Sequence, residues 1–252
     1  MPDESNVKTV VIGVGPEDGL GAQLCARFLR RGHHVFMAGR TGETLEALAR
    51  TFGGKATTIA TDATDESQVD ALFDAVDAAD GELKLAIYNV GNNRPGPIAD
   101  MESRYFERSL DVGIYGAFLF GREAVRRLRR GARGGSPRKK GGGTLIFTGA
   151  SASLRGRANY GAFNASKGAQ RALAQAMAKE YATDGVHVSH VVIDGPIGGE
   201  KIKQGLPEYA ERLGEAGMIS IQGIVDAYEF LYDQPPNAWT FELDIRTSLE
   251  KW

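Results

Sequence analysis

Short apolar runs alternate with segments of helical spacing along the first half of the chain. Residues 7–14 contain four valines and an isoleucine and end among glycines, a pattern typical of a parallel strand buried on both faces. Leu20, Leu24 and Phe28 then recur one helical turn apart, and Gly32 follows as a stop signal. The chain therefore opens with a strand, a glycine-rich turn and a helix.

The same alternation of strand and helix continues to the end of the chain. Further strands are expected at residues 35–38, 57–60, 83–88, 144–148, 186–193 and 239–243, and further helices at residues 43–52, 66–79, 101–130, 159–183, 207–217 and 221–232. Thr64 or Asp65 is the expected N-cap of the third helix. Such alternation predicts an α/β fold, a Rossmann-type, doubly wound, seven-stranded parallel sheet with helices on both faces. Neither a linker nor a repeat interrupts residues 1–252, so we expect a single domain.

Composition adds little beyond excluding several classes of protein. The chain is 42% hydrophobic and 25% charged with a net charge of −2, so neither nucleic acid nor an anionic membrane is an expected partner. Cys25 is the one cysteine, which excludes an internal disulfide and a cysteine-based metal site. Without a long apolar run or a secretion signal, the expectation is a cytoplasmic protein that acts on a small molecule.

One segment departs from this charge balance. Residues 126–143 hold eight Lys or Arg and six glycines. A nucleic-acid patch is conceivable there, but the segment lacks aromatic residues for base stacking. It also leaves the end of a helix and enters the start of a strand, whereas ligands bind at the carboxyl ends of strands. We favour a solvated, mobile loop.

The turn after the first strand is a candidate nucleotide site. Gly15, Gly19 and Gly21 give a G-x-x-x-G-x-G spacing, and Leu20 begins the next helix. Glycines are needed where the turn is tight, where backbone approaches a pyrophosphate and where helix meets strand. The helix N-terminus directs free N–H groups at the phosphates. Placed between a strand and a helix, this spacing indicates a dinucleotide site rather than a mere tight turn.

The end of the second strand indicates which dinucleotide binds. NAD sites carry an Asp or Glu about 20 residues after the glycines. Here the strand ends in Gly39 and Arg40, with no carboxylate. Gly39 leaves room, and the Arg40 guanidinium can bind a 2′-phosphate. We therefore expect NADP(H) to be preferred over NAD(H), the alternative being an arginine on a solvated turn.

In combination these features resemble the short-chain dehydrogenase/reductase family over nearly the whole chain. The three glycines match its glycine motif, although Val14 stands where a threonine is usual, and Lys167 matches the lysine of its Tyr-x-x-x-Lys motif. Three further segments are similar to family segments that follow strands: Asp62-Ala63, Asn89-Val90-Gly91 and Asp194-Gly195-Pro196-Ile197.

The resemblance implies roles for these residues. Asp62 and Ala63 would contact adenine, and Asn89 and Gly91 would lie along the cofactor. Gly195 and Ile197 would lead into the substrate loop. Lys167 would bind the nicotinamide ribose and lower the pKa of a catalytic tyrosine. The resemblance also implies a homodimer through the helices at 101–130 and 159–183, often doubled to a homotetramer.

The catalytic residues of the family are where this sequence departs. The position four before Lys167 is Phe163 rather than tyrosine, and phenylalanine has no proton to donate. The expected serine falls at Ala150, with Ser151 one place later, and the expected asparagine is Gly113.

Other groups are candidates for the missing acid. Tyr160 lies three residues before Phe163, and on a continuous helix it would share that side of the helix. Ser151, Ser153 and Tyr115 are weaker candidates. The histidines, His33, His34, His187 and His190, have no metal-ligand spacing, so we attribute them to packing and expect no metal.

The sequence leaves two functions open. The first is an NADP(H)-dependent oxidoreductase with a non-standard proton donor, acting on a carbonyl, an alcohol or an activated double bond. The second is a cofactor-binding sensor or scaffold without redox activity, because the tyrosine, serine and asparagine are all missing while the binding glycines persist.

Overall fold

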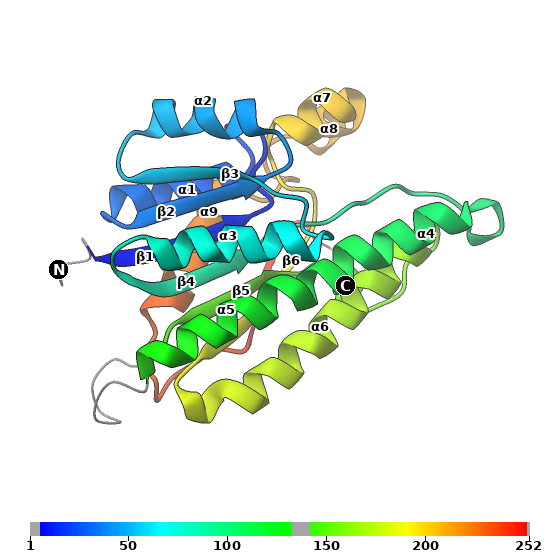
Figure 1. The fold of residues 1–252 in the computed structure, drawn as a ribbon. Coiled ribbons are helices and arrows are strands. Elements are labelled where there is room, and N and C mark those ends of the chain that lie inside the picture. Colours follow the sequence, from blue (N-terminus) through cyan, green and yellow to red (C-terminus); the bar gives the residue numbers. More distant parts are fainter. Residues whose placement is uncertain (1–5, 133–141, 251–252) are drawn as a thin grey trace.

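The computed structural model describes residues 6–132 and 142–250. Its seven strands form one parallel sheet in the order β3-β2-β1-β4-β5-β6-β7, as expected for a Rossmann-type fold (Figure 1). The strands are β1 (Val7–Ile12), β2 (His34–Gly39), β3 (Ala56–Ala60), β4 (Glu82–Tyr88), β5 (Thr144–Thr148), β6 (His187–Asp194) and β7 (Glu242–Arg246). The predicted fold class is confirmed.

Helices cover both faces of this sheet. On one face lie α1 (Leu20–Arg30), α2 (Gly42–Phe52) and α9 (Ile221–Asp233), and on the other lie α3 (Glu66–Ala78), α5 (Gly116–Ala132) and α6 (Gly161–Tyr181). Two hydrophobic cores fill the layers between sheet and helices. Val10 and Val11 of β1 are both fully buried, one in each core. The central strand is therefore apolar on both faces, as its sequence predicts.

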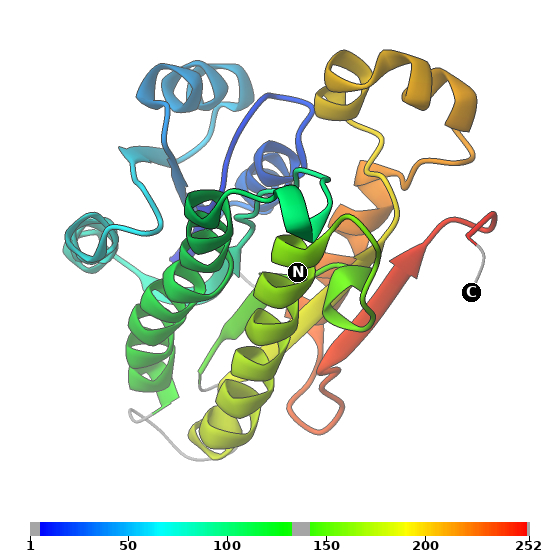
Figure 2. The same cartoon turned by 90° about the vertical axis from the view of Figure 1, so that its right-hand side faces the viewer.

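Smaller elements follow the carboxyl ends of the strands. Here lie α4 (Ser103–Leu110), α7 (Glu200–Gly205), α8 (Pro207–Leu213) and the 3-10 turns η1 (Ile98–Asp100) and η3 (Ser151–Ser153), while η4 (Ala182–Asp184) follows α6. Figure 2 looks onto the end of the sheet at which α7 and α8 lie. No helix in the described part of the chain is both long and apolar enough to cross a membrane.

The register of the central strands determines where the candidate site lies. Ile12 at the end of β1 pairs with Ala38 of β2 on one side and with Tyr88 of β4 on the other. The residues after these three strands therefore meet at one edge of the sheet. The chain passes from β3 at one side of β1 to β4 at the other, so this edge is the switch point at which doubly wound folds bind ligands.

The helix predicted at residues 101–130 is interrupted. A π-helical turn, η2 (Asp111–Tyr115), separates α4 from α5. Gly116 at the start of α5 has no room for a side chain, because a Cβ there would lie 2.7 Å from the Ala63 carbonyl oxygen. The hydroxyl of buried Tyr88 donates to the Val112 carbonyl at 2.6 Å. This part of the helix is thus held against the sheet by close backbone contacts that apolar spacing does not reveal.

Two other boundaries differ from the prediction near the end of the chain. The last strand begins at Glu242 rather than at residue 239, because Trp239 stacks on the His187 ring and the Thr240 amide donates to the Gln234 side chain. The helix expected at 207–217 ends at Leu213, followed by Gly214 with a φ of +60°. The short helix α7 before it was not predicted.

The basic stretch at 126–143 also differs from the expected loop. Its first part continues α5, and there Arg127 and Arg129 are paired with acidic residues. Residues 133–141 lie outside the described residues. Because α5 ends at Ala132 and β5 begins at Thr144, the stretch does join the end of a helix to the start of a strand, as predicted.

Candidate cofactor-binding and active site

The glycines of the turn after β1 serve different purposes. A Cβ on Gly21 would lie 2.5 Å from the Gly13 carbonyl oxygen, so Gly21 lets α1 approach the strand. The Gly19 amide donates to the Pro16 carbonyl at 2.9 Å and closes the turn. A Cβ on Gly15 would have no atom within 4 Å. Gly15 therefore borders open space in which a ligand can approach the backbone.

The N-terminus of α1 fits an anionic group. Its N-cap is Gly19, no side chain caps it, and its first turn carries no acidic residue. Leu20 is buried and anchors this turn in the core. The free N–H groups and the positive end of the helix dipole are therefore available for a pyrophosphate.

Gly13 is a site residue that sequence reasoning missed. It has a φ of +93°, and a Cβ there would lie 2.4 Å from the Asn89 carbonyl oxygen. The Asn89 side chain joins three strand ends, since Nδ2 donates to the Gly13 carbonyl at 3.1 Å and Oδ1 accepts from Thr148 Oγ1 at 3.0 Å. The signal was the pair of glycines at 13 and 15. Asn89, which was expected along the cofactor, links the ends of β1, β4 and β5 beneath the site.

The end of β2 presents an exposed cation. Arg40 is exposed, and the Thr61 amide donates to the Gly39 carbonyl at 2.8 Å. A Cβ on Gly39 would lie 2.4 Å from the Val14 carbonyl oxygen. The glycine is therefore required by close contact with the turn after β1, which is a different reason from the room for a phosphate that the sequence suggested.

The expected adenine pair lies after β3. Asp62 Oδ1 accepts from the amide of Thr64 at 2.9 Å and from its hydroxyl at 2.8 Å, which fixes the turn into α3. Asp65 caps that helix, since its carboxylate accepts from the Gln68 amide, so the second of the two expected N-caps is the one used. Ala63 is buried, 4% exposed.

Lys167 is buried beneath the site rather than solvated. It is 4% exposed, and its Nζ donates to the Thr148 carbonyl at 2.7 Å and to Gln170 Oε1 at 3.0 Å, with the Val90 carbonyl at 3.5 Å. A Cβ on Gly91 would lie 3.6 Å from this Nζ. Burial lowers the pKa of Lys167 to about 8. The ammonium is thus held at the ends of β4 and β5, where the resemblance places the nicotinamide ribose.

The candidate acids lie around the start of α6. Phe163 lies one turn before Lys167 and is half-buried, and Ser151 begins η3 and is also half-buried. Tyr160 is the N-cap of α6 with a φ of −125°, and its ring lies 5.0 Å from the Arg157 guanidinium carbon. Because the helix begins after Tyr160, the condition on which this phenol would share a helical side with Phe163 is not met. Asn159 precedes it with a φ of +69°, which is not a helical conformation. The helix therefore begins later than the predicted residue 159.

The remaining weak candidates have other surroundings. The Ser153 hydroxyl donates to the Ala150 carbonyl at 2.7 Å, and Tyr115 is 43% exposed. Gly113 lies in the π-helical turn, where a Cβ would be 2.4 Å from the Cβ of Ser166 on α6. The neighbouring helix therefore fills the space at Gly113, where the resemblance implies an asparagine.

The segment after β6 approaches the glycine turn. Gly195 follows the strand with a φ of +157°, and Ile197 forms a parallel bridge with Ile219. A Cβ on Gly199 would lie 2.8 Å from the Asp18 carbonyl oxygen. A cavity of about 710 Å³ lies between α7, α8 and the start of α9, lined by residues that include Lys203, Ala210, Met218 and Gln222.

An ion cluster at the end of β6 was not foreseen. Asp194 is 3% exposed and accepts from Arg155 Nη2 at 3.0 Å, with Arg246 Nη2 at 3.7 Å. Arg155 also lies 3.7 Å from Glu250. These residues are far apart in sequence, so no local pattern signals the cluster.

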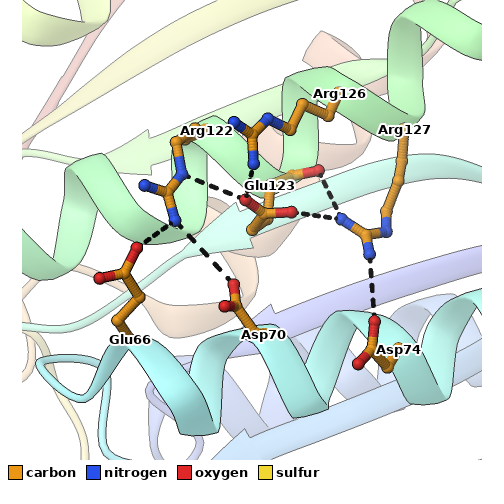
Figure 3. Close-up of a pocket in the computed structure, with 7 residues that line it drawn as sticks. All are labelled: Glu66, Asp70, Asp74, Arg122, Glu123, Arg126 and Arg127. Atoms are coloured by element: carbon orange, nitrogen blue, oxygen red, sulfur yellow. Dashed lines mark hydrogen bonds and ion pairs between the residues drawn. The ribbon is translucent and has the colours of Figure 1, made fainter.

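A second hollow, of about 470 Å³, lies between α3 and α5 (Figure 3). It is lined by Glu66, Asp70, Asp74, Arg122, Glu123, Arg126 and Arg127. Glu123 is buried and accepts from the three arginines. Arg122 pairs with Glu66 and Arg127 with Asp74 across the two helices, so we interpret the hollow as part of a helix-to-helix ion-pair network.

The four histidines are all buried and packed as expected. His33 bonds Thr9, His34 bonds Thr57, and His190 Nδ1 lies 3.1 Å from Glu242. Burial lowers the pKa of His190 to about 4. No group of three metal-ligating side chains occurs among residues 6–132 and 142–250.

Comparisons with known proteins agree with this geometry. The model of the family described as short chain dehydrogenase matches residues 8–198. A short-chain dehydrogenase from Rhodopseudomonas palustris is 33% identical, with a TM-score of 0.78 over 96% of this chain and 98% of that one. A metagenomic short-chain oxidoreductase in complex with NADP is 23% identical, with a TM-score of 0.78 over 98% and 99% of the two chains.

The uncharacterized oxidoreductase YuxG of Bacillus subtilis is 26% identical over 206 residues, which are 80% of this chain but 29% of the relative. The family match and the Rhodopseudomonas structure each cover more than two thirds of the chain. This chain therefore belongs to the short chain dehydrogenase family of NAD(P)-binding oxidoreductases.

Proposed function

We propose that this protein is an NADP(H)-dependent oxidoreductase acting on a small carbonyl compound, an alcohol or an activated double bond. The buried Lys167 ammonium carries the proposal. It lies at the carboxyl ends of β4 and β5 with its Nζ facing Gly91. Burying a cation that has no carboxylate partner among the described residues is costly, and a group with so perturbed a pKa at the ligand-binding edge of the sheet is a candidate functional group.

The surrounding residues fit the cofactor. The uncapped N-terminus of α1 and the open space at Gly15 would hold the pyrophosphate, and Lys167 would hold the nicotinamide ribose. Asp62 and Ala63 would lie beside the adenine, and the segment from Gly195 to Ile197 would border the nicotinamide. When bound, the cofactor supplies or accepts a hydride at the substrate carbon.

Arg40 supports a preference for NADP(H). It is exposed at the end of β2, where an NAD site would carry a carboxylate. A guanidinium there can form paired hydrogen bonds to a 2′-phosphate.

The proton donor differs from the usual tyrosine. Phe163 occupies that position, and Ser151 and Tyr160 are the hydroxyl-bearing candidates that we consider. Ser151 follows β5 at the ligand-binding end of the sheet, and we propose that its hydroxyl hydrogen-bonds the substrate oxygen. Tyr160 would need to leave its stacking on Arg157 to reach the same oxygen.

One observation favours the alternative, a cofactor-binding protein without redox activity. The contact between Gly113 and Ser166 leaves no room for a side chain at the position of the family's asparagine. A chain that had lost its proton relay and kept its binding glycines would show this combination.

The partner we propose is a second copy of the chain, in a dimer or tetramer. Phe106 of α4, Tyr115 of the π-helical turn and Phe118 of α5 are 38%, 43% and 40% exposed, respectively. Three large apolar side chains along one continuous helical segment favour contact with another helical surface.

Parallel calorimetric titrations with NADPH and NADH test the cofactor proposal. We expect at least a tenfold preference for NADPH, about 1.4 kcal/mol. Arg40→Ala should abolish this preference, whereas Arg50→Ala, an exposed arginine on α2, should retain it. Failure of the wild-type protein to bind either dinucleotide would overturn the proposed function.

Turnover then separates the enzyme from the inactive binder. NADPH oxidation with a panel of carbonyl compounds and activated alkenes should be measurable and should be lost in Lys167→Met. Ser151→Ala should lower kcat by at least about tenfold, as removal of a transition-state hydrogen bond does. Tight NADPH binding with no turnover on any substrate would favour the sensor or scaffold.

A further inference from the structure

Among residues 6–132 and 142–250, the one side chain that bonds the Lys167 ammonium is that of Gln170. The two residues lie three positions apart on α6 and therefore on the same side of the helix. Gln170 is fully buried, and its Oε1 accepts from Lys167 Nζ at 3.0 Å. The two further acceptors near this Nζ are the backbone carbonyls of Thr148 and Val90. Of the three acceptors around Lys167 Nζ, Gln170 is thus the one that a side-chain substitution can remove.

The other half of the Gln170 amide is unpartnered. Because an ammonium can only donate, the oxygen must face Lys167 and the Nε2 group must point elsewhere. That Nε2 is buried and has no hydrogen-bond partner in the described part of the chain. A buried donor left unpaired costs stability, so a glutamine is a poor residue here on packing grounds alone.

We propose that Gln170 is a positioning residue for Lys167, fixing the ammonium in front of Gly91 through Oε1. This inference rests on the proposed function only in its consequence for catalysis, since the contact itself is between two residues of this chain. Gln170 touches neither substrate nor cofactor and acts through Lys167 alone.

The other charged groups packed near Lys167 are engaged with one another rather than with its ammonium. On β6, His190 is fully buried and bonded to Glu242 of β7, which in turn pairs with Arg171 of α6. Burial, joined by the charges of Lys167 and Arg171, holds the pKa of His190 at about 4, so His190 is neutral near neutral pH. Hydrogen bonds from Arg171 hold the pKa of Glu242 below its usual value, so Glu242 is ionised.

The adjacent π-helical turn contributes two further titratable groups. Asp111 and Tyr115 are both exposed there, and solvent screens the Asp111 carboxylate. Burial lowers the pKa of Lys167, whereas the acceptors around its Nζ favour the charged form.

The test measures the pKa of Lys167 directly in the protein without cofactor. Side-chain NMR of the lysine Cε–Nζ group, assigned by its loss in Lys167→Met, is followed against pH. Gln170→Glu places a carboxylate on the ammonium and should raise this pKa by about one unit or more. Gln170→Met keeps the volume but removes the acceptor, and should lower the pKa.

Gln175→Glu is the matched control, since Gln175 lies on the same helix and is half-buried. It should leave the pKa of Lys167 unchanged. An unchanged Lys167 pKa in either Gln170→Glu or Gln170→Met overturns the inference. Because either variant decides, failure of one to fold still leaves a deciding measurement.

The pH profile of NADPH turnover separates this inference from the proposed function. If Gln170 positions Lys167, the basic limb of kcat in each Gln170 variant should move in the same direction as the NMR pKa. A shifted NMR pKa in a protein that binds no dinucleotide would overturn the proposed function and leave the Gln170 contact standing. A normal pH profile with a shifted NMR pKa would refute its role in catalysis.

Discussion

A Cβ on Gly113 would lie 2.4 Å from the Cβ of Ser166, closer than side chains approach one another. Gly113 belongs to a π-helical turn whose Val112 carbonyl accepts from buried Tyr88, so the turn cannot easily move away from α6. Gly113, where the resemblance implies an asparagine, therefore has no space for a side chain. Irregular helical turns of this kind are frequent at functional sites, and this one has been packed against its neighbour.

Gly113→Ala should destabilise the protein by about 1–3 kcal/mol, the usual cost of overpacking a tight contact. Ser166→Gly alone should cost about 1 kcal/mol, because glycine disfavours a helix interior. The double variant should lose less stability than the sum of the two single losses, because removing the serine side chain makes room for the new Cβ at residue 113. Urea unfolding of the four proteins gives this coupling, and strict additivity would contradict the contact.

The stability of the protein should rise at alkaline pH because of Lys167. The pKa of this lysine is about 8 in the folded protein, below its ordinary 10.5. Folding thus disfavours the charged form of Lys167. This loss of folding free energy is fully present below the pKa of the folded protein and disappears as the pH rises toward the pKa of the unfolded chain. Relative to Lys167→Met, the wild-type protein should gain about 3 kcal/mol over this window.

Unfolding by urea at several pH values measures this gain. Lys179 lies on the same helix but is exposed, so Lys179→Met should follow the wild-type pH dependence. A constant difference between wild type and Lys167→Met across the window would show that the ammonium is not buried in solution.

The proposed dimer predicts which surface substitution separates the copies. Phe118→Asp places a charge at the start of α5 beside exposed Tyr115 and should give a monomer. Phe230 of α9 is 55% exposed on the other face of the sheet, so Phe230→Asp should leave that dimer intact. Sedimentation velocity distinguishes the two results. A monomeric wild-type protein, or a dimer lost only in Phe230→Asp, would refute this interface.

Much of the fold follows from local sequence patterns. The valines of β1 and the spacing of Leu20, Leu24 and Phe28 predicted their elements because each pattern reports burial on one or both faces of the same element. The π-helical turn and the displaced start of β7 were missed. Both depend on contacts with distant residues, such as Tyr88 with Val112 and Trp239 with His187.

The candidate site likewise has residues that the sequence could identify and contacts that it could not. The glycines after β1 and the match of Lys167 were visible in the sequence because a turn or a motif needs those residues at fixed spacing. That Gly39 is required by the Val14 carbonyl, or that Gln170 meets Lys167, was not visible, since both are close approaches fixed by packing. The roles of the site residues remain predictions.

Glu123 should be the key acidic residue of the network between α3 and α5. It is 6% exposed and accepts from Arg126 at 2.6 Å and Arg127 at 2.7 Å. Burial raises its pKa, but these arginines more than offset that and hold the pKa below the ordinary 4.5. The contribution of Glu123 to stability is therefore complete above the pKa of the unfolded chain and is lost as the pH falls through the pKa of the folded protein.

Glu123→Gln should cost about 1–3 kcal/mol in urea unfolding at neutral pH and little in acid. Glu46→Gln, in an exposed pair at 3.9 Å, should cost at most about 0.5 kcal/mol, and an equal loss in both variants would contradict the network.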